Sequence, residues 1–354
     1  MKLVLVGVIA VAFVAACGDN GEPTPAVVDA SVDDAEPVSC EAGQTLFGSA
    51  DGVFVCLALA PSGSLVLEAQ EIDTDTDVRC VTPGKGQDGC ALAAQTITVT
   101  GRVRAYGSRT LILIATDHLD VMQAAAIDVS SNETTWGASA NQCRPWDPQM
   151  SAYQRAAEGG QLARATVDGV HGGCPGQPGY RYACTIDPEP PGGGGGAVLL
   201  IAPTVAIDGV VNASGAGGGA ARGTSQSYFH GVCGAGGGGS GGMIVIDAHA
   251  IQGDGLLLAT GGGGGGAINN ADDPTGRGHE PDESMPLVAA VGGAGFMDPY
   301  MRVAAGGPGG MISNSVGGAG SGSGPQNYWG ANGGGAGTIT LSAAFSGVVA
   351  PSRE

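Results

Sequence analysis

The sequence predicts an all-β protein whose core is a right-handed parallel β-helix, or β-solenoid, interrupted by long glycine-rich inserts. Two observations predict this fold. Apolar and polar residues alternate along short segments, which is the pattern of half-buried strands. One such segment, 197–215, also aligns without gaps with 243–261, which lies 46 residues further along the chain. A single repeat cannot bury its own apolar face, whereas stacked repeats can.

The first sixteen residues predict a secretory signal. A single cation, Lys2, precedes an apolar run from Leu3 to Ala16, and this run is shorter than the ~20 residues that span a bilayer. The sequence Val-Ala-Ala-Cys that ends at Cys17 resembles the lipobox of lipoprotein precursors. We therefore expect cleavage before Cys17, its acylation, and attachment to the cell envelope, in the outer membrane. The alternative is an ordinary signal peptide followed by an incidental cysteine.

Composition and charge restrict the partners of the chain. It has 67 glycines and 20 prolines in 354 residues, yet 43% of its residues are hydrophobic. We expect packed and glycine-rich parts to alternate along the chain. The net charge of −19 disfavours nucleic acid and anionic lipid as partners. Membrane attachment must then come from acyl chains, and polysaccharide or other envelope components remain as partners.

The segment after the lipobox divides into a tether and a cysteine-bearing region. Residues 17–39 are acidic, contain proline and lack apolar periodicity, which predicts a disordered tether. Residues 40–95 predict short strands stapled by disulfides. Eight cysteines remain once Cys17 carries lipid, and an even number in an exported chain favours disulfides. Proximity along the sequence predicts the pairs Cys40–Cys56, Cys80–Cys90, Cys174–Cys184 and Cys143–Cys233.

The β-solenoid is expected over 96–354. In 97–107, Ile97, Val99, Val103 and Ala105 fall on one face, and Thr98, Thr100, Arg102 and Arg104 on the other. This segment aligns without gaps with 205–215. Weaker copies are 110–131, with two extra residues, and 338–350.

Glycine-rich inserts separate the copies, at 132–196, 216–242 and 262–337. Such inserts are either mobile or form extended, polyproline-II-like rods packed side by side, because glycine lets backbones approach closely. The first insert also concentrates aromatic residues, which either stack on sugars or form a small core of their own. These residues are Trp136, Trp146, Tyr153, Tyr180 and Tyr182.

Three motifs carry weak chemical signals. Asp73, Asp75 and Asp77 form D-x-D-x-D, whose carboxylates either converge on a calcium ion or form a solvated turn. Asp208 and Asp254 occupy equivalent repeat positions before glycine, which favours a turn over an ion site or the acid pair of a glycosidase. Ser240 fits G-x-S-x-G, but a strand-to-helix context is missing, so we interpret the match as chance.

Several segments together resemble the glycine-rich, β-helix-like lipoproteins of myxobacteria. They are the lipobox, EIDTDTDVRC (71–80), ITVTGRVRAYGSR (97–109), IDVSS (127–131) and IAPTVAIDG-like strands between glycine tracts. The resemblance implies this architecture and a location at the cell surface, but it implies no activity.

The expected function is a structural or adhesive role as a non-enzymatic lipoprotein of the cell envelope. No catalytic residue and no cofactor is expected, apart from calcium at the Asp73 motif. Two alternatives stay open. One is a carbohydrate-active β-helix enzyme, either a polysaccharide hydrolase or a lyase, and the other is a calcium-dependent binding module.

Overall fold

The computed structural model describes most of the chain after the expected tether. The described residues are 39–48, 53–58, 60–140, 142–145, 157–166, 169–179, 181–182, 190–222, 232–268, 277–281, 288–294, 305–310, 317, 319–320 and 331–351. They lie in one compact body, Ser39–Glu354. Their regular elements are β-strands and one 3-10 helix, η1 (Leu162–Arg164), which confirms the all-β class. The signal 1–16, Cys17 and the tether up to residue 38 lie outside the described residues.

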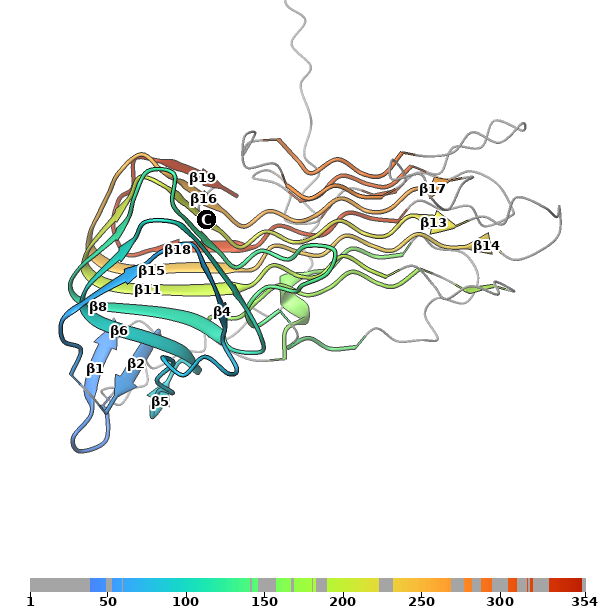
Figure 1. The fold of residues 1–354 in the computed structure, drawn as a ribbon. Helices are drawn as coiled ribbons and strands as arrows, with labels where there is room; N and C mark the ends of the chain where they lie inside the picture. Colours follow the sequence, from blue (N-terminus) through green and yellow to red (C-terminus); the bar gives the residue numbers. More distant parts are fainter. Residues whose placement is uncertain are drawn as a thin grey trace, which may run out of the picture. The chain divides into compact units, whose positions relative to one another are not determined.

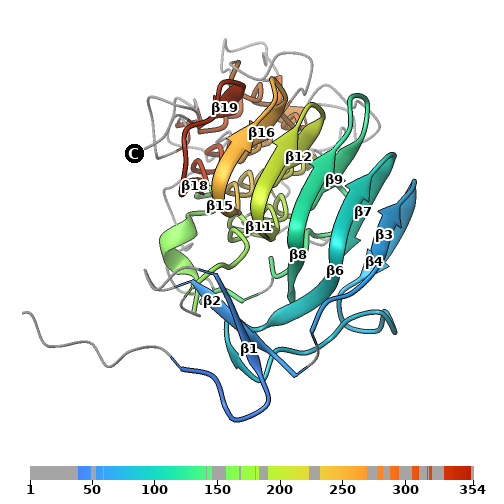
Figure 2. The same cartoon turned by 90° about the vertical axis from the view of Figure 1, so that its left-hand side faces the viewer.

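Two parallel six-stranded sheets form the body (Figures 1 and 2). We name them the long-strand sheet and the short-strand sheet. The long-strand sheet contains β3 (Ser64–Leu67), β6 (Gly89–Val99), β8 (Thr110–Val121), β11 (Ala197–Ile207), β15 (Met243–Gln252) and β18 (Thr338–Leu341). The short-strand sheet contains β4 (Gln70–Asp73), β7 (Arg102–Tyr106), β9 (Ala126–Asp128), β12 (Val210–Asn212), β16 (Leu256–Leu258) and β19 (Val348–Ala350). Each long strand is followed along the chain by a short one, so six repeats lie side by side.

The strand register confirms the repeat alignment. Ala197 pairs with Met243 and Val210 with Leu256, which is the offset of 46 that the sequence predicts. The alignment of 97–107 with 205–215 also holds, since Ile97 and Val205 both pair with Leu119.

Two details of the predicted repeats were wrong. Segment 110–131 has three extra residues, not two, because one lies in a bulge of β8 and two lie in the turn before β9. The parallel sheets also begin at Ser64 in β3, well before residue 96. The segment Ser64–Asp73 is too short to show a clear alternation, so its place in the sheets could not be identified from periodicity.

Two layers of apolar side chains pack against the sheets. Inward side chains of both sheets form the main core, and Ile97, Val103, Val205 and Ile207 are fully buried in it. A second layer covers the outer face of the first halves of β8, β11 and β15. It is completed by a small antiparallel sheet of β1 (Thr45–Gly48), β2 (Phe54–Leu57) and β5 (Lys85–Gly86). Burial on both faces explains why these half-strands are continuously apolar.

Glycine-rich tracts run side by side beyond the strand ends (Figure 1). We call this set of tracts the glycine array. Its described tracts are 157–160, 172–179, 190–196, 213–219, 234–242, 259–266, 290–294, 305–310 and 331–337. Two short strand pairs lie further along the inserts. The parallel pair is β13 (Ala221–Arg222) with β17 (Ala267–Ile268), and the antiparallel pair is β10 (Arg181–Tyr182) with β14 (Val232–Cys233).

Hydrogen bonds in the array recur every third residue. In tract 236–242, the amides of Gly236, Gly239 and Gly242 donate to tract 213–219, those of Gly237 and Ser240 to tract 174–177, and those of Gly238 and Gly241 to tract 332–335. One tract thus bonds three neighbours in turn, as expected for a helix of three residues per turn, which is the polyproline-II geometry. Of the two alternatives for the inserts, the described tracts show the packed rods.

Close backbone contact explains the need for glycine in these rods. A methyl group on Gly239 would overlap the carbonyl oxygen of Gly193 in the neighbouring rod. Gly253, in contrast, closes a turn with φ of 95°, a conformation that glycine adopts without strain. This turn is the reason that glycine breaks the apolar pattern of the 243–261 repeat.

Candidate binding cleft

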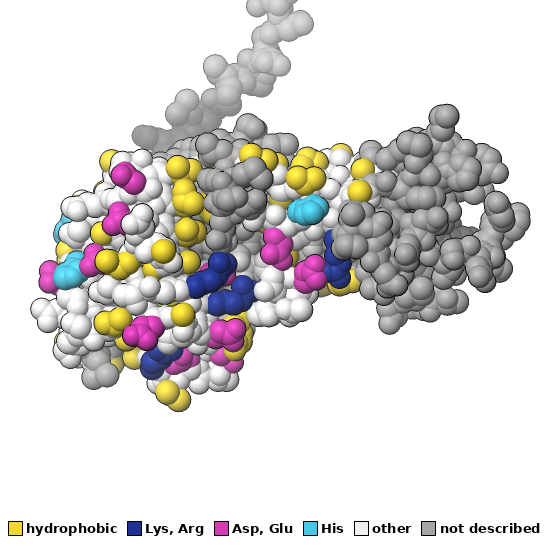
Figure 3. All heavy atoms as spheres, turned by 45° about the horizontal axis from the view of Figure 1, so that its top comes forward, with side chains coloured by type: hydrophobic (Ala, Val, Ile, Leu, Met, Phe, Trp, Pro, Cys, Tyr) yellow, Lys and Arg dark blue, Asp and Glu magenta, His cyan; other side chains and the backbone are white. Residues whose placement is uncertain are grey.

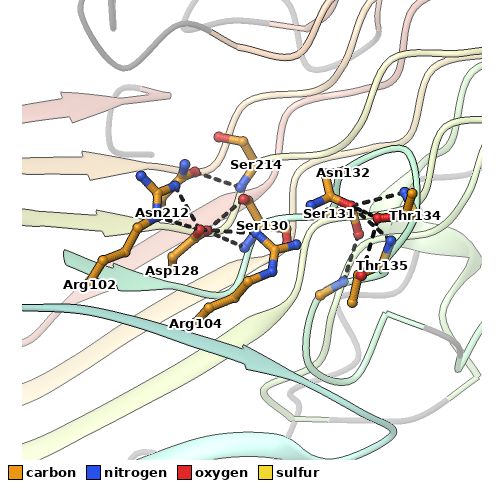
Figure 4. Close-up of polar contacts among 11 residues, drawn as sticks. Arg102, Arg104, Asp128, Ser130, Ser131, Asn132, Thr134, Thr135, Asn212 and Ser214 are labelled. Carbon is orange, nitrogen blue, oxygen red and sulfur yellow. Dashed lines mark hydrogen bonds and ion pairs between the residues drawn. The ribbon is translucent and has the colours of Figure 1, made fainter. Parts of the chain in front are cut away.

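A polar cleft of about 500 Å³ lies where the short-strand sheet meets the glycine array. Strands β7 and β12 contribute Arg102, Arg104 and Asn212 to its lining. The segments after β9 and β12 contribute Ser130, Ser131, Asn132, Ser214 and Gly215, and Glu280 and Pro281 come from the third insert. Figure 4 shows two groups of these side chains, one around Asp128 and one that contains Ser131 and Asn132.

Strand alternation turns both arginines toward the cleft. Val103 and Ala105 face the core, so Arg102 and Arg104 face outward from β7. The parallel register then places Arg104 beside Asp128, and Asp128 beside Asn212. Three consecutive repeats therefore supply one outward row of cation, carboxylate and amide.

Asp128 organises this row. Its side chain is fully buried, and five hydrogen bonds reach its two oxygens. Oδ2 accepts from Arg102 Nη2 at 2.7 Å, Arg102 Nε at 3.1 Å and Arg104 Nη1 at 3.2 Å. Oδ1 accepts from the Ser130 amide at 3.0 Å and the Ser130 hydroxyl at 2.6 Å. Such charge-assisted bonds fix both guanidinium planes, and 53% of the Arg102 side chain stays exposed against 19% for Arg104.

The strand ends repeat one turn motif around the cleft. The carboxylate of Asp128 accepts from the Ser130 amide, and the amide oxygen of Asn212 accepts from the Ser214 amide at 3.0 Å. The hydroxyl groups of Ser214 and Thr260 lie 3.2 Å apart, which extends the same position into the next repeat. These aspartate and asparagine turns lead the chain from the sheet into the rods.

The segment after β9 forms the neighbouring wall. Ser131 accepts a hydrogen bond from the Gly137 amide at 2.7 Å. The side-chain oxygen of Asn132 accepts from the amides of Thr134 and Thr135 at 3.0 and 2.8 Å. Trp136 packs against the backbone of Gly193 next to the Ser131 hydroxyl. A hydrogen-bonded turn and a glycine rod therefore support the wall that the segment after β9 forms.

Glu280 brings a second carboxylate to the cleft. Partial desolvation, together with the nearby carboxylate of Glu133, raises the pKa of Glu280 above its usual value, although Arg104 opposes this shift. Glu133 itself forms an ion pair with Arg277. The charge of the cleft consequently depends on the protonation of Glu280.

The lining is polar and carries charges of both signs, because Arg102 and Arg104 lie in the same cleft as Glu280. Basic side chains are few on the face shown in Figure 3, and acidic ones are spread among them, so two arginines in one cleft are unusual for this chain. Guanidinium groups bind carboxylate and phosphate, while serine hydroxyls and asparagine amides bind hydroxyl groups.

The side chains of Asp73, Asp75 and Asp77 accept hydrogen bonds from other groups of the protein. Asp73 accepts from the Asp75 amide and the Thr76 hydroxyl at 3.0 and 2.8 Å. Asp75 accepts from the Ser108 hydroxyl at 2.6 Å, and Asp77 pairs with Arg79 at 2.6 Å. Within the described part of the chain, no group of three potential metal-ligating side chains is found. Of the two alternatives for this motif, the hydrogen bonds favour the turn over a calcium site.

The structure corrects part of the disulfide prediction. Cys40–Cys56 and Cys80–Cys90 are confirmed. Cys143, however, bonds Cys174, so the predicted pairs Cys174–Cys184 and Cys143–Cys233 were both wrong. The insert folds back on itself, since Cys143 and Ala165 form an isolated antiparallel β-bridge. Proximity along the sequence cannot predict such folding. Cys184 lies outside the described residues.

The remaining predicted motif residues, Ser240, Asp208 and Asp254, do not line the cleft. Ser240 is fully buried in the array, where its hydroxyl accepts from the Cys174 amide at 2.8 Å. Asp208 and Asp254 are exposed residues of the turns between long and short strands. Asp254 accepts a hydrogen bond from the Ser346 hydroxyl at 3.2 Å.

Sequence reasoning missed Asp128 and the cleft around it. The available signal was the pair of outward arginines, two residues apart, in a chain with only 14 basic residues. A second signal was the recurrence of Asp-x-Ser (128–130) and Asn-x-Ser (212–214) at equivalent repeat positions.

No family model, curated protein or solved structure matches this chain. In the part that the structure describes, no helix has the length and apolar character needed to cross a bilayer.

Proposed function

We propose that this protein is a non-enzymatic lipoprotein of the cell envelope with a structural and adhesive role. Acylated Cys17 would anchor it in the outer membrane, and the body beyond the tether would present a rigid binding surface. In this proposal the two parallel sheets are faces of a right-handed β-solenoid. The alternation of strands between the sheets and the constant register of neighbouring repeats support that interpretation.

The glycine array is the observation that carries the proposal. The tract amides donate to three neighbouring rods in rotation, and a side chain at Gly239 would force rods apart. Ordering so many glycines costs more conformational entropy than ordering other residues. Once this entropy cost is met, the packed rods form a stiff scaffold. A stiff scaffold suits a protein that holds a target rather than one that closes over a substrate.

The hydrogen bonding of Asp128 favours binding over hydrolysis at the cleft. Its two oxygens accept five bonds from Arg102, Arg104 and Ser130, so it is a poor candidate for a general base. Asp208 and Asp254, the pair considered for a glycosidase, are exposed turn residues. We therefore favour the non-enzymatic role over the carbohydrate-enzyme alternative.

Fractionation and adhesion of cells expressing the full chain test this proposal. Wild-type protein should sediment with outer membranes, and Cys17→Ser should appear in the soluble fraction. Cells that display the wild-type protein should be retained on surfaces coated with envelope polysaccharide, compared with cells that lack it. Membrane association that survives Cys17→Ser would overturn the anchor, and equal retention of both cell types would overturn the adhesive role.

A further inference from the structure

We propose that the cleft between the short-strand sheet and the glycine array binds a neutral saccharide. In this proposal the carboxylate of Glu280 accepts hydrogen bonds from two neighbouring hydroxyl groups of the sugar, and the side-chain NH2 group of Asn132 donates to another. The inference deepens the adhesive role and rests on it, because it identifies the site and the class of target that the protein would hold.

The lining of the cleft is polar on nearly every side. Its side chains are those of arginine, serine, asparagine and glutamate, with Gly215 and Pro281 as the exceptions. Among the described residues, none of those that line the cleft is aromatic or a branched aliphatic residue. An apolar ligand would displace water from these groups without replacing its hydrogen bonds, which costs free energy. A suitable ligand therefore donates and accepts hydrogen bonds over most of its surface.

The charges at the cleft balance. Arg102 and Arg104 share the buried carboxylate of Asp128, and Glu280 adds a second carboxylate to the lining. Two cations thus accompany two anions. Arg102 is also engaged beyond its bonds to Asp128, so we assign it no contact with the ligand. A ligand with a net charge of either sign would meet a like charge in this cleft, whereas a neutral ligand would not.

Two lining side chains offer groups to a ligand. The side-chain oxygen of Asn132 accepts from the amides of Thr134 and Thr135 (Figure 4). These bonds fix the plane of the amide group and leave its NH2 group to donate. The carboxylate of Glu280 has about four acceptor sites, and the Glu133 amide, its backbone donor, occupies at most one of them. The lining thus holds a fixed donor and an acceptor of high capacity.

A saccharide matches both kinds of group in one molecule. Each hydroxyl group both donates and accepts, and neighbouring hydroxyl groups on a sugar ring lie close enough for one carboxylate to accept from both. The Ser130 hydroxyl donates to Asp128 at 2.6 Å, so its oxygen can still accept from a further hydroxyl group. A peptide, in contrast, spaces its backbone donors and acceptors more widely and brings apolar side chains that this lining would not cover.

The floor of the cleft is fixed before a ligand binds. Asp128 accepts five hydrogen bonds from Arg102, Arg104 and Ser130. The amide of Gly215 donates to the neighbouring repeat, which holds the start of the glycine rod. Groups that are already ordered lose little conformational freedom on binding. The cleft volume of about 500 Å³ lies within the range of small-ligand sites and suits a short oligosaccharide segment.

Isothermal titration of the full-length protein in detergent tests the inference. The probes are three neutral trisaccharides that differ in the stereochemistry of their hydroxyl groups, namely cellotriose, mannotriose and galactotriose. For the trimer that binds best, the uronate and the amino-sugar trimers of the same linkage are the matched charged ligands. Wild-type protein should bind at least one neutral trimer, and should bind both charged relatives of that trimer about tenfold more weakly or worse.

Two conservative variants remove the proposed contacts. Glu280→Gln takes away the charged acceptor and should lower the affinity about tenfold or more. Asn132→Asp keeps the oxygen that accepts from the Thr134 and Thr135 amides, loses the NH2 donor, and should lower the affinity about threefold or more. Asp254→Asn changes an exposed carboxylate that does not line the cleft and should leave the affinity unchanged. Melting curves establish that each variant is folded before titration.

The inference is overturned if none of the three neutral trimers binds folded wild-type protein, or if a charged relative binds as tightly as its neutral counterpart. Equal affinities of Glu280→Gln and Asp254→Asn would also overturn it. If cells that carry Glu280→Gln are retained as well as wild-type cells, the cleft is not the adhesive site, while the adhesive role stands. If the trimers bind but wild-type cells are not retained, the adhesive role fails, while the saccharide site stands.

Discussion

Replacement of Asp128 by asparagine isolates the contribution of its charge. Asn212 occupies the adjacent register position in the next repeat, so an asparagine side chain fits this row without a change of shape. The substitution leaves Arg102 and Arg104 next to each other without their shared carboxylate. It also places an NH2 group where one of the two oxygens accepted hydrogen bonds.

The magnitude follows from burial and screening. Removing one partner of a buried ion pair costs about 3–5 kcal/mol. Since half of Arg102 is exposed, solvent screens the uncompensated charge, and we expect about 2–3 kcal/mol for Asp128→Asn. Asp77→Asn is the control, because the side chain of Asp77 is 12% exposed whereas that of Asp128 is fully buried, and pairs nearer the surface contribute about 1 kcal/mol or less.

Thermal melting at neutral pH measures both variants. Asp128→Asn should lower the melting temperature by about 4 °C or more, and Asp77→Asn should change it much less. The reasoning fails if Asp128→Asn melts with the wild type, or if the two variants are destabilised equally. Either result would mean that Asp128 does not hold the two arginines.

Three further predictions follow from the core, the cleft and the disulfides. Ile207→Asp should destabilise severely, because an unpaired charge in the core costs several kcal/mol. Thr98→Asn, on the outward face and beside Asp120, should be nearly neutral, and equal losses of the two variants in urea unfolding would contradict the core. The raised pKa of Glu280 means that the folded state favours its protonated form, so stability is lost as pH rises through that pKa. Glu280→Gln should thus raise the melting temperature at pH 7 and leave it unchanged at pH 4, and the reverse pattern would refute the shift. Non-reducing peptide mapping should recover Cys143 linked to Cys174, and a link from either to another cysteine would disprove the fold of the first insert.

The sheets were predictable because their determinants are local and repeated. Alternation marks the inward faces of β7 and β11, and a constant offset between copies sets the register of β11 and β15. The first repeat, β3 and β4, was missed because four-residue strands are too short for periodicity to identify.

The cleft was not predictable from local pattern because it depends on lateral pairing between repeats. Arg104 and Asp128 are 24 residues apart, and Glu280 arrives from a different insert. Their proximity depends on the bulge in β8 and on the longer turn before β9, which a gapless alignment does not include. The sequence allowed two interpretations of the glycine tracts, packed rods or mobile loops. Only the hydrogen bonds between the tracts distinguish the two.

Amide hydrogen exchange of the glycine tracts tests the central claim most directly. The account predicts protection of the tract 236–242, whose amides bond three neighbouring rods, at a level near that of the strand β11. Gly239→Ala should abolish this protection and leave β11 protected, because its methyl group overlaps the Gly193 carbonyl oxygen. Gly63→Ala strains a turn outside the array, where φ is 70°, and should preserve protection in the tract. Exchange of the wild-type tract at the rate of an unstructured chain would contradict the glycine array.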